Sequence, residues 1–190
     1  IKEHENVDFV KGVAKVLDNH RVSVTAVDGS WSKVVEAKYI LLATGSLPIK
    51  LPIEGADLAI GSQELFGYKT GYRKVPYDVV VIGGGYIGVE VSSALSALGV
   101  KVTIVEMLPR ILSGWDSSVV KAIEEKLRSR GVEILTGSRV VGIKASGGRK
   151  IVEYVKQDGG RGYVEASEVI MAVGRRPNVE GLEHLGIVDR

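Results

Sequence analysis

The sequence predicts an α/β fold in which helices cover a parallel sheet and an antiparallel meander of three strands follows. Three observations carry this prediction. Short apolar runs alternate with helical patterns over residues 79–136, glycines stand at the ends of the predicted helices, and an alternating apolar pattern begins at Arg139. Because a helix lies in each connection between the first three strands, these strands are expected to be parallel.

The first quarter of the chain is expected to consist of strands and turns. Alternating apolar residues predict three strands, over residues 7–16, 21–27 and 34–38. The continuous apolar run over residues 39–43 predicts a further strand that is buried on both faces. It leads into Thr44-Gly45-Ser46, a small polar loop at which the backbone can approach a ligand.

A polar segment rich in glycine and proline follows. It spans residues 48–75, and only residues 62–66 have a helical pattern, with Ser62 as the expected N-cap. The segment therefore predicts a connection between two structural units, the second of which begins at Pro76.

The most informative stretch joins a buried strand to a glycine-rich turn. Residues 79–82 are apolar, and Gly83, Gly85 and Gly88 then satisfy the pattern G-x-G-x-x-G. An amphipathic helical segment follows and reaches Gly99, a residue type that commonly ends helices.

Each part of this stretch suits a bound dinucleotide. Gly83 permits the tight turn, Gly85 lets a pyrophosphate approach the backbone, and Gly88 lets helix and strand pack together. Unpaired N–H groups at the helix N-terminus favour the pyrophosphate charge. A second strand, over residues 101–105, ends on Glu106, at about the 20-residue spacing expected for a carboxylate that binds ribose hydroxyls. A turn without a ligand is the alternative, but the order of the elements favours a Rossmann-like dinucleotide site.

Further elements complete the predicted sheet and meander. A helix is expected over residues 116–130, with Asp116 as its N-cap and Gly131 as its stop. The remaining strands are predicted over residues 133–136, 139–145, 151–156, 162–165 and 168–173. The loops after the parallel strands should meet at the carboxyl edge of the sheet, where ligands bind in such folds.

Composition excludes several other classes of function. With 190 residues and a net charge of +2, the chain has no bias towards a nucleic-acid or membrane partner. It contains no Cys, which excludes disulfides and thiolate zinc sites within it, and its three His are isolated, so no metal site is expected. No secretory signal is visible, and a cytoplasmic location is expected. A first residue of Ile rather than Met is expected of a fragment.

Four segments resemble a known family in order and spacing. They are GVAKV at residues 12–16, LLATGSLPIKLP at 41–52, VIGGGYIGVE at 81–90 and AVGRRPN at 172–178. The chain resembles the middle part of the flavin-dependent pyridine nucleotide–disulfide oxidoreductases, and dihydrolipoamide dehydrogenases most of all. The resemblance implies part of an FAD-binding domain over residues 1–47, an NAD-binding domain over 48–176, and a return to the FAD-binding domain over 177–190.

The resemblance also assigns site residues. The expected NAD-binding residues are Gly83, Gly84, Gly85, Tyr86, Ile87, Gly88, Glu90, Glu106, Val140 and Gly174. Tyr86 is expected to cover the flavin, Glu90, in the first helical turn, to reach the nicotinamide carboxamide, and Val140 either to contact adenine or only to pack in the core. The expected FAD-binding residues are Ala14, Thr44, Gly45 and Ser46, which would act through the backbone. No catalytic residue is expected in this chain.

NAD rather than NADP is favoured by charge. A carboxylate at Glu106 accepts hydrogen bonds from a free ribose 2′-hydroxyl but repels a 2′-phosphate. In NADPH-using relatives Arg occupies the positions of Met107 and Ser113. Arg110 is the one nearby basic residue that opposes this interpretation.

In this family the redox cysteine pair and the flavin glycine motif would precede Ile1, and a dimerisation domain with a catalytic His would follow Arg190. The implied reaction is oxidation of dihydrolipoamide by NAD⁺ through a disulfide and FAD, in a homodimer that serves a 2-oxo acid dehydrogenase complex. This chain alone is expected to be inactive. The alternatives are an NADH-dependent flavoprotein oxidase or ferredoxin-type reductase without redox thiols, an NADPH-dependent enzyme similar to glutathione or mercuric reductase, and a non-enzymatic nucleotide-binding module.

Overall fold

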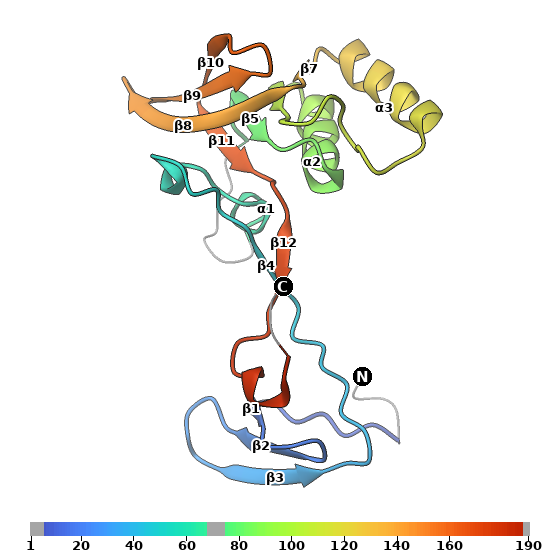
Figure 1. Ribbon diagram of the computed structural model, residues 1–190. Helices are drawn as coiled ribbons and strands as arrows, with labels where there is room; N and C mark the ends of the chain where they lie inside the picture. Colours follow the sequence, from blue (N-terminus) through green and yellow to red (C-terminus); the bar gives the residue numbers. More distant parts are fainter. Residues whose placement is uncertain (1–5, 68–74, 188–190) are drawn as a thin grey trace. The chain divides into compact units, whose positions relative to one another are not determined.

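Residues 6–67 and 75–187 are described in the computed structural model of the chain (Figure 1). The chain divides into two compact units, the first formed by Ile1–Leu47 with Arg176–Arg190 and the second by Pro48–Arg175. Two short strands, β4 (Ser46–Pro48) and β12 (Arg175–Pro177), pair where the chain passes from one unit to the other.

The first unit contains an antiparallel sheet of three strands. The strands are β1 (Val13–Val16), β2 (Arg21–Thr25) and β3 (Ser32–Glu36), in the order β1-β2-β3, and a short 3₁₀ helix, η2 (Glu183–Leu185), follows late in the chain. A tight turn joins β1 to β2, since the Asp18 carboxylate accepts hydrogen bonds from the backbone N–H groups of His20 and Arg21, both at 2.9 Å. The buried apolar residues in the described part of this unit are Val16, Val24, Ala26 and Leu182.

Two predictions for this unit are wrong. Residues 7–12 form no strand, because β2 pairs only with Val13–Val16 before the chain turns. Residues 39–43 form no buried strand either. Tyr39 and Leu41 are each 91% exposed, and no strand pairs with this run within residues 6–47 and 176–187. An apolar run becomes a buried strand only where neighbouring strands and helices cover it.

The second unit is built on a parallel sheet of four strands, which confirms the predicted fold class. The strands are β5 (Asp78–Ile82), β6 (Lys101–Val105), β7 (Glu133–Leu135) and β11 (Glu168–Met171), in the order β11-β5-β6-β7. The predicted meander is also present, as β8 (Ser138–Ser146), β9 (Arg149–Lys156) and β10 (Arg161–Ala166). The helices are α1 (Ser62–Leu65), α2 (Tyr86–Ala97) and α3 (Ser117–Ser129), with a 3₁₀ turn η1 (Ala56–Leu58).

Alternate residues of β5 belong to two separate hydrophobic cores, one on each face of the sheet. Val79 and Val81 pack with buried residues of α2 and α3, whereas Val80 and Ile82 pack with buried residues of the meander. Figure 1 shows α2 and α3 on one side of the parallel sheet and β8–β10 on the other. All five residues of β5 are buried, as expected for a parallel strand that is covered on both faces.

The predicted ends of the helices are mostly confirmed. Gly99 and Gly131 follow α2 and α3 with φ of +82° and +80°, the left-handed conformation that ends helices. Asp116 caps α3, since its side chain accepts the N–H of Ser118 at 2.8 Å. Ser62 is not the N-cap of α1 but its first residue, and Gly61 is the N-cap.

A β-bulge corrects the predicted alternation in the first strand of the meander. The register of β8 against β9 shifts between Val140 and Gly142. As a result, Val140 and Ile143 are buried in the same core, at 5% and 1% exposure. Strict alternation would have placed them on opposite faces.

Residues 49–60 are more than a connection. Ile60 forms a parallel bridge with Ile170 of β11, and Glu54 forms one with Gly142 of β8. A Cβ on Gly55 would lie 1.8 Å from the carbonyl oxygen of Ile143, so only glycine permits this approach. The segment is therefore fixed to both the parallel sheet and the meander.

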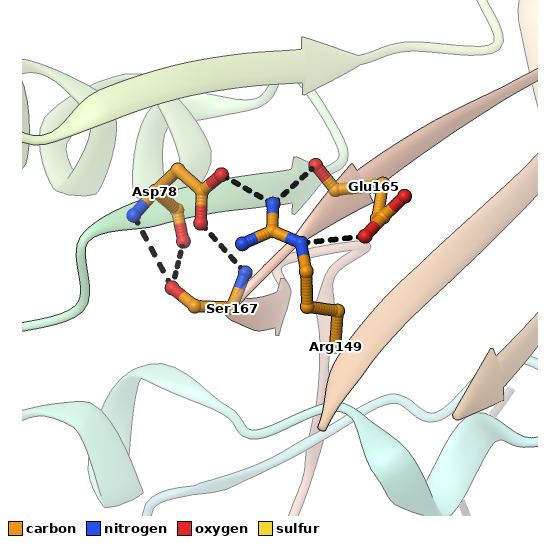
Figure 2. Close-up of polar contacts among 4 residues, drawn as sticks. All are labelled: Asp78, Arg149, Glu165 and Ser167. Carbon is orange, nitrogen blue, oxygen red and sulfur yellow. Dashed lines mark hydrogen bonds and ion pairs between the residues drawn. The ribbon is translucent and has the colours of Figure 1, made fainter. Parts of the chain in front are cut away.

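An ionic cluster joins the meander to the start of β5. Arg149 of β9 donates to the carboxylate of Asp78 at 2.6 Å and pairs with Glu165 of β10 at 2.6 Å (Figure 2). The backbone N–H of Ser167 donates to the same carboxylate at 2.7 Å. Burial by itself raises the pKa of Asp78, but hydrogen bonds from Arg149 and Ser167 outweigh it and lower this pKa below its ordinary value.

No helix in the described ranges, 6–67 and 75–187, is long and apolar enough to cross a membrane.

The first prediction concerns this cluster. Because the Asp78 pKa is lowered, the carboxylate stabilises the fold above about pH 4, and this contribution is lost as the pH falls through the lowered value. Asp78→Asn should reduce the free energy of unfolding by about 2 kcal/mol at pH 7. The difference from wild type should shrink below about pH 4, as followed by urea unfolding across the pH range.

Asp57→Asn is the matched control, because Asp57 forms an ion pair with Lys50 at 2.7 Å but is fully exposed to solvent. It should not change stability measurably, since exposed ion pairs contribute little. Equal effects of the two substitutions at pH 7 would contradict the role given to Asp78 in the ionic cluster.

Candidate functional site

The glycine-rich turn lies between β5 and α2, at the carboxyl edge of the parallel sheet. Gly83 has a φ of +102°, and a Cβ there would lie 2.5 Å from the carbonyl oxygen of Ala172. A Cβ on Gly88 would lie 2.0 Å from the carbonyl oxygen of Gly83. These two glycines therefore allow the turn and the close packing of α2 against the end of β5.

Gly85 is the N-cap of α2 and differs from these two glycines. A Cβ built on Gly85 would meet no atom within 4 Å, and its backbone has φ −72° and ψ −176°. The space beside Gly85 is therefore not filled by the protein. It leaves the first N–H groups of α2, at Tyr86 and Ile87, open to a ligand.

Glu106 follows β6 and is 9% exposed. Its Oε2 accepts the backbone N–H of Gly84 at 2.5 Å, and its Oε1 accepts the N–H of Leu108 at 2.7 Å. An ionised carboxylate has about four acceptor positions, so about two remain for ligand hydroxyls. The Gly84 N–H is committed to Glu106, and a bound pyrophosphate must therefore use donors from Gly85 onward.

The walls around this turn enclose a cleft of about 690 Å³. Its lining comes from the glycine turn, the residues after β6, the start of β8 and the residues after β11. The lining residues are Leu51, Pro52, Ile53, Ile82, Gly83, Gly84, Gly85, Tyr86, Ile87, Val105, Glu106, Met107, Leu108, Arg110, Leu112, Ser113, Ser138, Arg139, Val140, Ala172, Val173, Gly174 and Arg175. The volume falls within the range of about 300–1,000 Å³ typical of small-molecule sites.

Most of the residues expected to bind NAD line this cleft. They are Gly83, Gly84, Gly85, Tyr86, Ile87, Glu106, Val140 and Gly174. Val140 lines the cleft and is also buried in the core, so its packing in the core is confirmed, and its contact with adenine stays a prediction. Tyr86 is 57% exposed at the mouth of the turn.

Two expected NAD-binding residues lie elsewhere. Gly88 packs behind the turn against Gly83 and does not line the cleft. Glu90 is the fifth residue of α2, beyond the first turn in which it was expected, and it is exposed outside the cleft. The helix begins at Tyr86, so its first turn consists of residues 86–89 and the acid falls in the second turn.

The residues expected to bind FAD belong to the first unit and to β4. Ala14 is exposed on β1 and pairs with Val24 of β2. Thr44 donates a hydrogen bond from Oγ1 to the carbonyl oxygen of Asn178 at 2.6 Å, and the Asn178 N–H donates to Gly45 at 3.0 Å. Ser46 begins β4. The flavin contacts expected of these residues stay a prediction.

The structure adds cleft residues that the sequence analysis missed. Leu51, Pro52 and Ile53 form part of the wall, because the bridge to β8 folds the 49–60 segment over the sheet. Ser138 and Arg139 enter the lining beside Val140. For Ser138 and Arg139 the sequence signal was their position next to Val140, a predicted site residue.

A comparison with family models now identifies the class of protein. The model for pyridine nucleotide-disulphide oxidoreductase matches residues 1–189. The chain belongs to this family.

Known proteins similar to the chain include several enzymes named dihydrolipoyl dehydrogenase. One from Pseudomonas aeruginosa is 38% identical over 98% of this chain and 39% of its own length. One from Geobacillus stearothermophilus is 36% identical over 95% of this chain and 38% of its own length. The chain thus spans about two fifths of the length of these relatives.

A solved structure has the same fold. It is a Cu(II) complex of the HOCl-induced flavoprotein disulfide reductase RclA from Escherichia coli, which aligns with a TM-score of 0.78 at 26% identity. The alignment covers 99% of this chain and 41% of that protein.

The second prediction separates the two kinds of glycine in the turn. Gly88→Ala should lower the free energy of unfolding by about 1–3 kcal/mol, because its Cβ would overlap the carbonyl oxygen of Gly83. Gly85→Ala should leave stability nearly unchanged, because its Cβ meets no atom and its backbone suits any L-residue. Thermal unfolding of both variants checks the prediction, and a Gly88→Ala protein as stable as wild type would contradict it.

Proposed function

We propose that this chain supplies the NAD(H) site of an FAD-dependent disulfide oxidoreductase. The observation that carries the proposal is the glycine turn at the N-terminus of α2, where Gly85 opens onto a cleft that the buried carboxylate of Glu106 also lines. Membership of the pyridine nucleotide-disulphide oxidoreductase family supports it.

The residues present fit a dinucleotide. The N–H groups of Tyr86 and Ile87 would bind the pyrophosphate, and the missing side chain of Gly85 would leave room for it. Glu106 would accept hydrogen bonds from the ribose hydroxyls, and Val140 would contact the adenine. When bound, NAD supplies a nicotinamide that accepts or donates hydride. The chain binds and orients this group, and the Gly174 backbone would lie at its nicotinamide end.

Preference for NAD over NADP follows from the surroundings of Glu106. The carboxylate is nearly buried and held on both oxygens by backbone N–H groups, so it cannot swing away from a 2′-phosphate. A charge fixed at that position repels a second negative charge strongly, since burial weakens screening.

The substrate proposed is dihydrolipoamide, by analogy with the relatives named dihydrolipoyl dehydrogenase. An NADH-dependent flavoprotein oxidase without redox thiols is the second candidate, since a sequence without Cys in this part of the protein is expected of both enzymes. Two assays of the naturally occurring protein with NADH separate the candidates. Reduction of lipoamide indicates the disulfide oxidoreductase, and consumption of oxygen indicates the oxidase.

Homodimer formation, service in a 2-oxo acid dehydrogenase complex and a cytoplasmic location belong to the same proposal. The homodimer and the complex rest on family resemblance, and the location rests on the sequence analysis. One relative of this chain, from Dictyostelium discoideum, is named mitochondrial, so cell fractionation is the test of location.

The third prediction tests nucleotide preference. In a titration followed by nicotinamide fluorescence, the chain should bind NADH about tenfold or more tightly than NADPH. Glu106→Gln should reduce this preference, because it removes the charge and keeps a carbonyl acceptor for one of the two backbone N–H groups. Glu106→Ala is less suitable, since it would leave the N–H groups of Gly84 and Leu108 without their acceptors.

Glu125→Gln, an exposed acid on α3, is the matched charge control and should behave as wild type. Stronger binding of NADPH by wild type would contradict the role given to Glu106. Binding of neither nucleotide would contradict the proposed function itself.

The fourth prediction concerns turnover. The isolated chain should not catalyse electron transfer from dihydrolipoamide to NAD⁺, because thiol–disulfide exchange requires cysteine and the chain has none. An assay of NADH formation, with an authentic dihydrolipoyl dehydrogenase as the positive control, checks this. Measurable activity from the purified chain would refute it.

A further inference from the structure

The loop between β6 and α3 is attached to the glycine turn at two points besides Glu106. The backbone N–H of Leu112 donates to the carbonyl oxygen of Gly84 at 2.8 Å. The side chain of Ile111 is fully buried, and a Cβ on Gly84 would lie only 2.7 Å from its Cγ2 atom. The conformation of the turn therefore depends on the conformation of this loop.

Leu112 holds a backbone conformation that needs support. Its φ is +47°, the only positive φ of a non-glycine residue within residues 6–67 and 75–187. A leucine disfavours this left-handed region, because its Cβ crowds the neighbouring carbonyl. Such a conformation persists where surrounding interactions fix it.

Arg110 forms hydrogen bonds with the residues that follow Leu112 in the loop. Its Nη2 donates to the carbonyl oxygens of both Ser113 and Trp115, each at 2.8 Å. The Trp115 N–H in turn donates to the carbonyl oxygen of Leu112 at 2.9 Å. Arg110 thus closes residues 110–115 into a ring of hydrogen bonds around Leu112.

We infer that Arg110 is a positioning residue for the dinucleotide site, which acts by fixing residues 110–115 so that Leu112 holds Gly84 and the turn in place. The inference rests on the proposed function. Arg110 lines the cleft, but its role is to keep the turn in the conformation that aims the first N–H groups of α2 at the ligand.

Direct contact with a nucleotide 2′-phosphate is the competing role for Arg110. The guanidinium would have to leave two main-chain carbonyls to reach a phosphate. Its charge also acts on the N-cap of α3. Hydrogen bonds from Ser118 are the main cause of the lowered pKa of Asp116, and the charge of Arg110 contributes as well. Both observations favour the loop role.

The fifth prediction uses Arg110→Met, which keeps the aliphatic stem and removes the donors. NADH and NADPH should both bind about 5- to 30-fold more weakly, and the ratio of their dissociation constants should stay unchanged. Hydrogen exchange at the Leu112 amide should become faster, which reports the loop without any nucleotide. Lys121→Met on α3 removes an exposed positive charge outside the cleft and is the matched control.

Arg110→Lys distinguishes positioning from general destabilisation. A single nitrogen of Arg110, Nη2, donates both hydrogen bonds, so a lysine Nζ with its three donors can replace it. This variant should restore NADH affinity and slow exchange at Leu112.

Loss of NADPH binding alone in Arg110→Met would overturn the inference and make Arg110 a phosphate ligand. Unchanged affinity for both nucleotides, or unchanged exchange at Leu112, would also overturn it. If wild type binds neither nucleotide, the proposed function fails, and the inference fails with it. Failure of the inference and failure of the proposed function can be told apart, because only the second is seen as a loss of nucleotide binding by the wild-type protein.

Discussion

The close contact between Gly88 and the carbonyl oxygen of Gly83 is the constraint on which the site depends. It lets α2 pack directly against the end of β5, so that the helix N-terminus points at the carboxyl edge of the parallel sheet. Gly83 must at the same time turn beneath the carbonyl oxygen of Ala172. Any side chain at either position would push the helix away from the sheet, and the donors of α2 would lose their common direction. Among the glycines of the turn, only Gly85 has no atom near the position of a Cβ, so the space beside it is open to a ligand.

The sheet supports this arrangement because its two faces are covered by different elements. Val79 and Val81 anchor β5 to the helices, while Val80 and Ile82 anchor it to the meander. The meander is therefore part of the same folding unit as the parallel sheet, and its first strand can supply a wall of the cleft. The bulge in β8 and the approach of Gly55 bring residues 49–60 to the same place. Structural contacts and cleft lining are thus made by the same segments.

Glu106 shows how closely structure and recognition are combined here. Its carboxylate accepts backbone N–H groups from the turn and from the following loop before any ligand arrives. The charge that we propose selects between ribose forms is therefore also an acceptor that orders the turn. Through Leu112, the loop contributes a second contact to Gly84 from the carbonyl side. Recognition at this site is expected to be sensitive to residues that never touch the nucleotide.

The sequence alone determined the parallel sheet, the meander, the glycine turn and the acid after the second strand, because each has a periodic or short-range signature. Helix ends at Gly99, Gly131 and Asp116 were equally local and were predicted correctly. Tertiary structure decided the rest. The exposure of residues 39–43 depends on which elements cover them, and the burial of Ile143 depends on a bulge. The contacts of Arg110 and the inclusion of Leu51–Ile53 in the cleft depend on how a loop closes and how a segment folds back, and composition and spacing along the chain do not encode these.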